Sequence, residues 1–111
     1  MKLAFISGPY RADTIAGVVR NIRNAEAVAI EYWQKGYAVI CPHKNSSLLD
    51  GLADDSVWLE GDLEILSRCD LIVLVPGWEK SEGVKAEIEE AKKLGIPIEY
   101  CDLDTKPYLE V

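Results

Sequence analysis

The sequence predicts a single α/β domain in which a parallel β-sheet lies between two layers of helices. Four short apolar runs alternate with three longer helical segments along the 111 residues. This alternation is typical of parallel sheets that are covered on both faces. Three of the runs close at a glycine or proline, as buried strands do where they enter a turn. The length suits one domain, 1–111, with a modest core.

In the first half of the chain, two strands flank a long helix. Residues 3–6 form a short apolar run that closes at Ser7-Gly8-Pro9. A helix is expected from about 17 to 35, and Gly36 is its C-terminal stop. Residues 37–41 form the second strand, which closes at Pro42.

The second half repeats the alternation. A polar cluster, Asp54-Asp55-Ser56, offers N-caps for a helix that runs to about residue 68. Residues 71–75 form the most apolar strand, and a third helix starts at 81 or 82 and runs to 94, where Gly95 stops it. A fourth strand covers 96–101 with an irregular start at Pro97, and 102–111 receives no assignment.

These elements predict the strand order 2-1-3-4, because crossovers are right-handed and the loops are short. The expected fold is therefore a Rossmann-like or flavodoxin-like three-layer sandwich. The loops after strands 1 and 3 then meet at the carboxyl edge of the sheet, which is where such folds bind ligands. The long connection 42–54 is expected to form a wall or a lid.

The composition excludes several classes of function. The net charge is −7 and the pI is about 4.6, which argues against binding to nucleic-acid polymers. No apolar run is long enough to span a membrane, and residues 1–6 read as a strand rather than a signal peptide. We therefore expect a cytoplasmic protein that does not associate with membranes.

The sequence predicts neither a metal nor a cofactor. The three cysteines, Cys41, Cys69 and Cys101, lack CxxC spacing, and a role as small buried hydrophobes is favoured over a redox or metal role. His43 is the single histidine, so haem and zinc have no support. NAD is not expected, because Pro42-His43 stands after the second strand where a ribose-binding acid is needed.

Two carboxylates are candidates for chemistry. Glu87 falls inside the apolar stripe of the third helix, which contains Val84, Ile88, Ala91 and Leu94. We expect the nearby helix N-terminus to favour its ionised form, which suits a nucleophile. Asp62 lies on the flank of the stripe of Leu59, Leu63 and Leu66 in the second helix. A carboxylate pair in unequal environments can cleave glycosidic bonds, and a salt bridge to Arg11 or Arg23 is an equally good alternative.

The first loop and His43 are candidates for ligand binding. The loop Ser7-Gly8-Pro9-Tyr10-Arg11 leads into a helix and can hold a phosphate through backbone N–H groups, with Arg11 adding a charged contact. The alternative is an arginine on a solvated loop. His43 can bind the ligand or hold its own turn. Trp58 and Trp78 can stack on a nucleobase or pack as ordinary core residues.

Four segments in order resemble the nucleoside 2-deoxyribosyltransferase-like proteins, and most closely the 2'-deoxynucleoside 5'-phosphate N-hydrolases. They extend from the first strand to residue 98, and their joint order is more specific than any one of them. The segments are Phe5-Ile6-Ser7-Gly8-Pro9-Tyr10-Arg11, Gly61-Asp62-Leu63, Ser81-Glu82-Gly83-Val84-Lys85-Ala86-Glu87 and Leu94-Gly95-Ile96-Pro97-Ile98.

The resemblance implies that Glu87 attacks the anomeric carbon of a deoxyribose and that Asp62 assists the departing base. Ser81, where the transferases usually carry aspartate, and Arg11 would hold a 5'-phosphate, since a hydroxyl can donate to phosphate. The expected substrate-binding residues are Ser7, Gly8, Tyr10, Arg11, His43, Ser81 and Gly83.

Three alternatives remain open on these residues. The chain is expected to be a deoxynucleotide N-hydrolase, a transferase that exchanges bases between deoxynucleosides, or a non-catalytic nucleotide-binding module. The chain departs from the family pattern at Glu87-Ile88-Glu89, where many members have Glu-Leu-Gly, and at Phe5, which lacks a hydroxyl that some hydrolases offer. Family sites are often completed by a neighbouring subunit, and a homodimer or higher homo-oligomer is expected.

Overall fold

The computed structural model describes residues 1–104 and contains one four-stranded parallel sheet. The strands are β1 (Leu3–Ser7), β2 (Ala38–Ile40), β3 (Leu71–Leu74) and β4 (Ile98–Tyr100), and the α-helices are α1 (Ile15–Gln34), α2 (Pro42–Asn45), α3 (Asp55–Leu66) and α4 (Glu82–Leu94). A short 3₁₀ turn, η1 (Trp78–Lys80), precedes α4. The strand order is β2-β1-β3-β4, as predicted.

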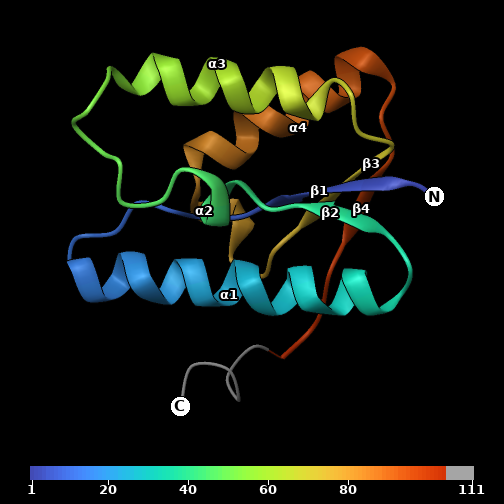
Figure 1. The fold of residues 1–111 in the computed structure, drawn as a ribbon, viewed down its shortest axis with the longest axis horizontal. Coiled ribbons are helices and arrows are strands. Elements are labelled where there is room, and N and C mark those ends of the chain that lie inside the picture. The colour runs from blue at the N-terminus through green and yellow to red at the C-terminus, as the bar shows by residue number, and fades with distance from the viewer. Residues whose placement is uncertain (105–111) are drawn as a thin grey trace.

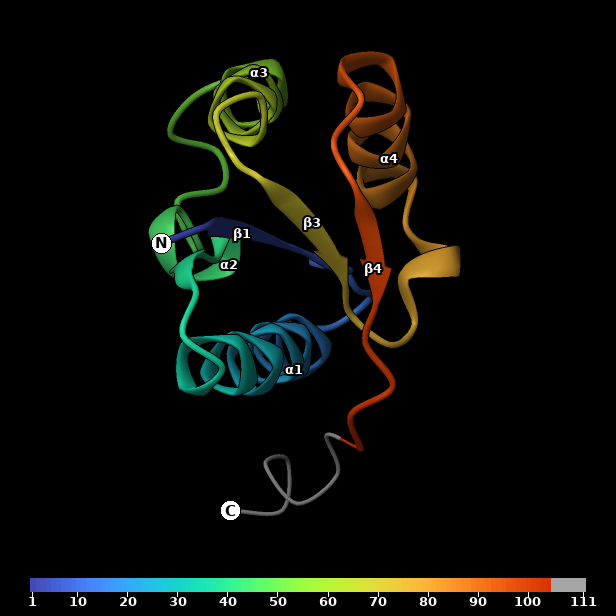
Figure 2. The ribbon, with the colours of Figure 1, turned by 90° about the vertical axis from the view of Figure 1, so that its right-hand side faces the viewer.

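The helices cover both faces of the sheet, so the predicted three-layer sandwich is confirmed. Figure 2 shows α1 on one side of the strands and α3 with α4 on the other. Side chains alternate along β1 because successive residues of a strand point to opposite faces. Ala4 and Ile6 pack in the core cluster with α1, whereas Phe5 packs in the cluster with α3 and α4. Ser7 follows Phe5 on that second face.

Local sequence signals explain where two of the helices begin and end. The Thr14 hydroxyl accepts a hydrogen bond from the Gly17 N–H, so α1 starts two residues earlier than predicted. Ser81 caps α4 in the same way, and Gly95 ends that helix with φ of 71°, a conformation that glycine adopts without strain. The predicted bounds of α4 are correct.

Several predicted details are wrong. The connection 42–54 is not a plain loop, because Pro42 starts the short helix α2. β4 is limited to Ile98–Tyr100, since Pro97 cannot donate a backbone hydrogen bond and delays the pairing. Leu59 and Leu94, which helical periodicity assigns to apolar stripes, are 41% and 47% exposed. Residues 105–111 of the unassigned tail lie outside the described residues.

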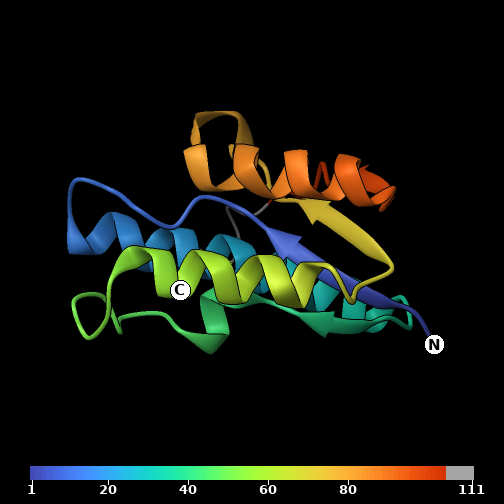
Figure 3. The ribbon, with the colours of Figure 1, turned by 90° about the horizontal axis from the view of Figure 1, so that it is seen from above.

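The arrangement gathers the connecting loops at the carboxyl edge of the sheet. Figures 1 and 3 show that the connection after β1 and the segment between α2 and α3 project from the same end of the molecule, where α4 also begins. Among the described residues, none of the helices combines the length and apolar character that crossing a bilayer requires.

Candidate functional site

A cavity of about 950 Å³ opens at this edge of the sheet, a size that suits a small ligand. Its walls come from the β1–α1 loop, α1, α2, α3 and the start of α4. Six of the seven predicted substrate-binding residues line it: Gly8, Tyr10, Arg11, His43, Ser81 and Gly83. Asp62 and Glu87 also line it. Ser7 lies behind the wall and contacts Glu87.

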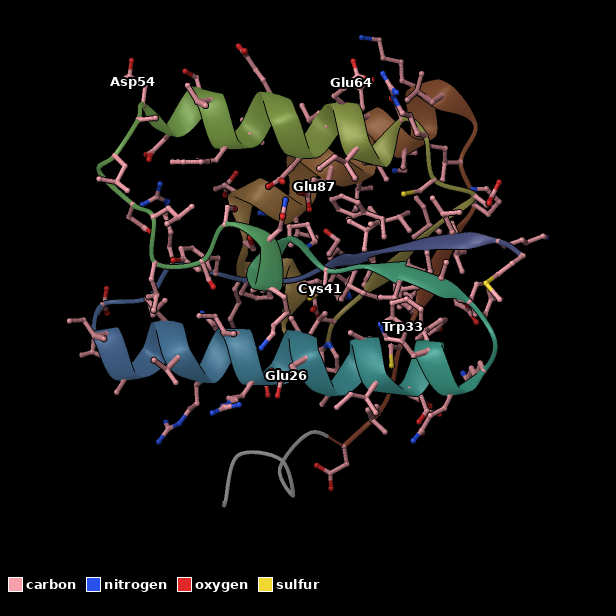
Figure 4. The ribbon with its side chains drawn as sticks, in the orientation of Figure 1. Glu26, Trp33, Cys41, Asp54, Glu64 and Glu87 are labelled. Atoms are coloured by element: carbon pink, nitrogen blue, oxygen red, sulfur yellow. The ribbon has the colours of Figure 1, made fainter. Side chains whose placement is uncertain are left out.

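Glu87 is buried and points toward the sheet, as its place in the apolar stripe predicts. Its side chain is 9% exposed, and the Ser7 hydroxyl donates a 2.5 Å hydrogen bond to Oε1. Figure 4 labels Glu87 in the space enclosed by α3, α4 and the sheet. Burial raises the pKa of this carboxyl to about 7, although the Ser7 hydrogen bond opposes the shift. The helix N-terminus is expected to favour the ionised form, but Glu87 lies in the second turn of α4 and its burial raises the pKa instead.

Asp62 faces the same cavity from α3. Burial raises its pKa to about 6, and its negative charge adds to the raised pKa of Glu87. The alternative role of the pair in salt bridges is not realised in the described part of the chain. Arg11 pairs with Asp55 and Arg23 with Glu26 instead. The two raised pKa values favour a pair that carries one proton near neutral pH, and the higher value places most of that proton on Glu87.

The start of α4 presents Ser81 and Gly83 to the cavity. The Ser81 hydroxyl accepts a 3.2 Å hydrogen bond from the Val84 N–H as the N-cap of the helix. A serine hydroxyl has one proton to donate in addition to its lone pairs. The capping contact uses a lone pair, so the proton of Ser81 is available to an anionic ligand at this helix N-terminus.

The β1–α1 loop is held against the opposite wall. The Tyr10 hydroxyl donates to Asp50 Oδ1 at 2.7 Å and accepts from the Leu48 N–H at 2.8 Å. Asn21 Nδ2 donates to the Tyr10 carbonyl oxygen at 2.9 Å. The Tyr10 hydroxyl thus joins the loop to the segment before α3, while its ring lines the cavity. The sequence analysis did not find Asn21 or Asp50, because neither stands in a recognisable motif.

His43 holds its own turn and also lines the cavity. Its Nε2 lies 2.7 Å from the Pro9 carbonyl oxygen, which can only accept, so Nε2 carries a proton and donates. The ring is 6% exposed, and burial lowers the pKa of His43. His43 therefore holds its own turn, as one of its two predicted roles requires. Because it also lines the cavity, it can still contact a ligand. Within residues 1–104, Nδ1 has no hydrogen-bond partner.

The two tryptophans differ in position. Trp58 lines the cavity from α3, whereas Trp78 is partly buried and packs against the core cluster beside α4, with its ring centroid 5.6 Å from that of Tyr100. Stacking of a base on Trp78 is therefore not supported by its position. Cys41, Cys69 and Cys101 are unpaired thiols, and residues 1–104 contain no group of three or more acidic, cysteine or histidine side chains placed to hold a metal.

The arrangement can perform acid–base and nucleophilic chemistry on a small bound ligand. Two carboxyl groups with unequal pKa values can divide the roles of nucleophile and proton donor. A cation, Arg11, and a helix N-terminus with a free hydroxyl proton lie around the same cavity. These groups would stabilise an anionic group on the ligand.

Comparison with known proteins identifies the family of this chain but no activity. The sequence model of one protein family, described as a domain of unknown function (DUF7768), matches residues 2–101. No curated protein matches the chain.

Proposed function

The chain belongs to the DUF7768 family, and for this member we propose an N-glycosidase that cleaves the bond between base and deoxyribose in 2'-deoxynucleoside 5'-monophosphates. The observation that carries the proposal is the pair Glu87 and Asp62. The two carboxyl groups come from different helices, face one cavity and have raised, unequal pKa values. Paired carboxyl groups in unequal environments can divide the roles of nucleophile and acid in glycosidic cleavage.

Each carboxyl group has a defined part in the proposed reaction. The ionised Glu87 attacks C1' of the deoxyribose, the bond from C1' to the base nitrogen breaks, and its electron pair leaves with the base. Asp62 donates its proton to the departing base. Because Asp62 has the lower pKa of the two, the reactive form is the minor arrangement of the singly protonated pair, with the proton on Asp62 and Glu87 ionised. Water then attacks C1' of the glycosyl ester and gives a proton to Asp62, and Glu87 leaves as a carboxylate, so that both groups return to their starting states.

The phosphate of the substrate is assigned to Arg11, Ser81 and the start of α4. Arg11 supplies charge, the Ser81 hydroxyl donates, and the helix N-terminus favours an anion. Gly83, in the first turn of α4, leaves room beside Ser81, since a Cβ built on it would come no closer than 3.7 Å to the Ser81 hydroxyl. The net charge of −7 supports a single small anion over a polymer, because one local cation suffices for one phosphate.

The test incubates the protein with a panel of deoxynucleoside monophosphates and deoxynucleosides and measures the free base released by chromatography. We expect release from monophosphates by the wild type, none by Glu87→Gln, and full release by Glu89→Gln, which changes an exposed residue of the same helix. If deoxynucleosides exchange their base for a second free base, the protein is a transferase and the hydrolase proposal is wrong. Thermal stabilisation by monophosphates without any release would replace it by a non-catalytic binding module.

A further inference from the structure

We infer that Ser7 is a positioning residue for Glu87: it holds carboxyl oxygen Oε1, so that Oε2 is the oxygen that attacks the sugar. This assignment rests on the proposed function for its chemistry, and on a hydrogen bond between residues 80 positions apart for its geometry. It differs from the predicted role of Ser7 as a substrate contact.

The backbone fixes Ser7 more firmly than a loop residue. Ser7 is the last residue of β1 and pairs with Leu74 of β3, and its carbonyl oxygen accepts a 2.8 Å hydrogen bond from the Val75 N–H. Immediately after it, the chain passes so close to Val75 that a Cβ on Gly8 would lie 2.7 Å from the Val75 Cβ. The position of the Ser7 hydroxyl is therefore set by the central pair of strands.

Ser7 is buried and does not line the cavity. Its side chain is 1% exposed, and its hydroxyl proton is used by Glu87 Oε1 at 2.5 Å. Phe5, the neighbour of Ser7 on the same face of β1, is fully buried and apolar. On this face of the strand, Ser7 is thus the residue that brings a hydroxyl to the glutamate.

The contact has a chemical consequence for both states of Glu87. A hydroxyl that donates to a carboxylate stabilises the ionised form and lowers its pKa. When Oε2 bonds to C1', Oε1 becomes the carbonyl oxygen of the ester and can keep the hydrogen bond. Ser7 therefore favours the reactive ion and fixes which oxygen faces the sugar.

Other titratable groups share the cavity, and the test must separate them from Ser7. Asp62 is the charged group that shifts the pKa of Glu87, and it raises that pKa, whereas Ser7 lowers it. The remaining titratable or charged groups of the cavity wall are Tyr10, Arg11, His43, Asp50, Asp55, Lys80 and Glu82. Replacing Ser7 leaves all of these in place.

The experiment compares Ser7→Ala, Ser7→Thr and the control Ser67→Ala. Ser67 also donates to a glutamate, Glu64, but on the exposed surface of α3. The pKa of Glu87 is followed by NMR of carbon-labelled glutamate side chains, and kcat and KM for a monophosphate are measured from pH 5 to 9. We expect Ser7→Ala to raise the pKa of Glu87 by about 1 unit. Because Glu87 has the higher pKa of the pair, the alkaline limb of kcat should move upward by the same amount and the maximal kcat should fall, while KM stays within about twofold. Ser7→Thr, which keeps the hydroxyl, should restore the wild-type profile, and Ser67→Ala should match wild type.

Two failures are distinguishable. A wild-type protein that releases base from no substrate overturns the proposed function. An active wild type in which Ser7→Ala has an unchanged Glu87 pKa and an unshifted profile overturns the role of Ser7 alone. A uniform loss of kcat at every pH without a pKa shift also overturns it, because a merely structural residue would act in that way.

Discussion

Arg11 and Asp55 form an ion pair of 2.6 Å between the β1–α1 loop and the first turn of α3, and both residues line the cavity. The two side chains are 68% and 72% exposed, so water screens the pair and the contact is weak. A phosphate on Arg11 and the Asp55 carboxylate would both accept from this guanidinium group, and the two anions would repel each other. The carboxylate of Asp55 therefore competes with the proposed substrate for the same guanidinium group.

Asp55→Asn is expected to strengthen binding of phosphate-bearing ligands. Exposed pairs contribute about 0.2–1 kcal/mol, so KM for a monophosphate should fall by up to about fivefold, with KM for the corresponding nucleoside unchanged. The control is Glu64→Gln, which breaks the exposed pair with Arg68 at the end of α3, where Figure 4 labels Glu64. An increase of KM in Asp55→Asn would show that Asp55 helps to hold the ligand.

Asp62→Asn is expected to change the pH dependence of kcat/KM. The wild type should have a bell-shaped profile with apparent pKa values near 6 and 7 that belong to the carboxyl pair, since the reaction needs the pair with one proton. In Asp62→Asn the alkaline limb should disappear and the maximal rate should fall by about 10²–10⁴-fold. The substrate phosphate titrates near pH 6 in both proteins, so their difference isolates Asp62. An alkaline limb that persists in the variant would remove Asp62 as the acid.

Glu87→Gln is expected to change how stability depends on pH. The pKa of Glu87 rises from 4.5 to about 7 on folding, so the folded state binds the proton more tightly than the unfolded state. The contribution of this carboxyl to the free energy of unfolding is complete below pH 4.5 and is lost as the pH rises through about 7. At about 1.4 kcal/mol per pKa unit the loss is about 3 kcal/mol.

Urea unfolding at pH 5 and pH 8 measures this effect. The wild type should lose more stability between the two values than Glu87→Gln, and Glu89→Gln should behave as wild type because Glu89 is exposed. Equal pH dependence in all three proteins would mean that Glu87 is not desolvated in the folded protein.

Gly8→Ala is expected to destabilise the edge of the sheet on which the site is built. The added Cβ would lie 2.7 Å from the Val75 Cβ, and such overpacking costs about 1–3 kcal/mol. Gly61→Ala is the matched control, because its Cβ would meet nothing within 4 Å in α3 and alanine favours a helix by about 1 kcal/mol. Thermal unfolding should move the two midpoints in opposite directions, and a stable Gly8→Ala would contradict the close approach of β1 and β3.

Much of the fold follows from local sequence. The alternation of apolar runs and helical segments predicted the parallel sheet and its order, and Gly36, Ser81 and Gly95 mark helix ends by backbone rules that need no tertiary information. The errors occur where a local signal was overridden. Pro42, which the sequence predicts only as the end of a strand, is also the first residue of α2.

The sequence by itself determined that Glu87 faces inward and that the loops after β1 and β3 meet at one edge, because helical periodicity and strand order decide both. Only the tertiary structure decided the partners: Ser7 for Glu87, Asp55 for Arg11 and Pro9 for His43. It also decided that the pKa of Glu87 is raised rather than held low. The physical reason is that hydrogen bonds and desolvation depend on distances between residues far apart in the chain, and periodicity carries no information on those distances.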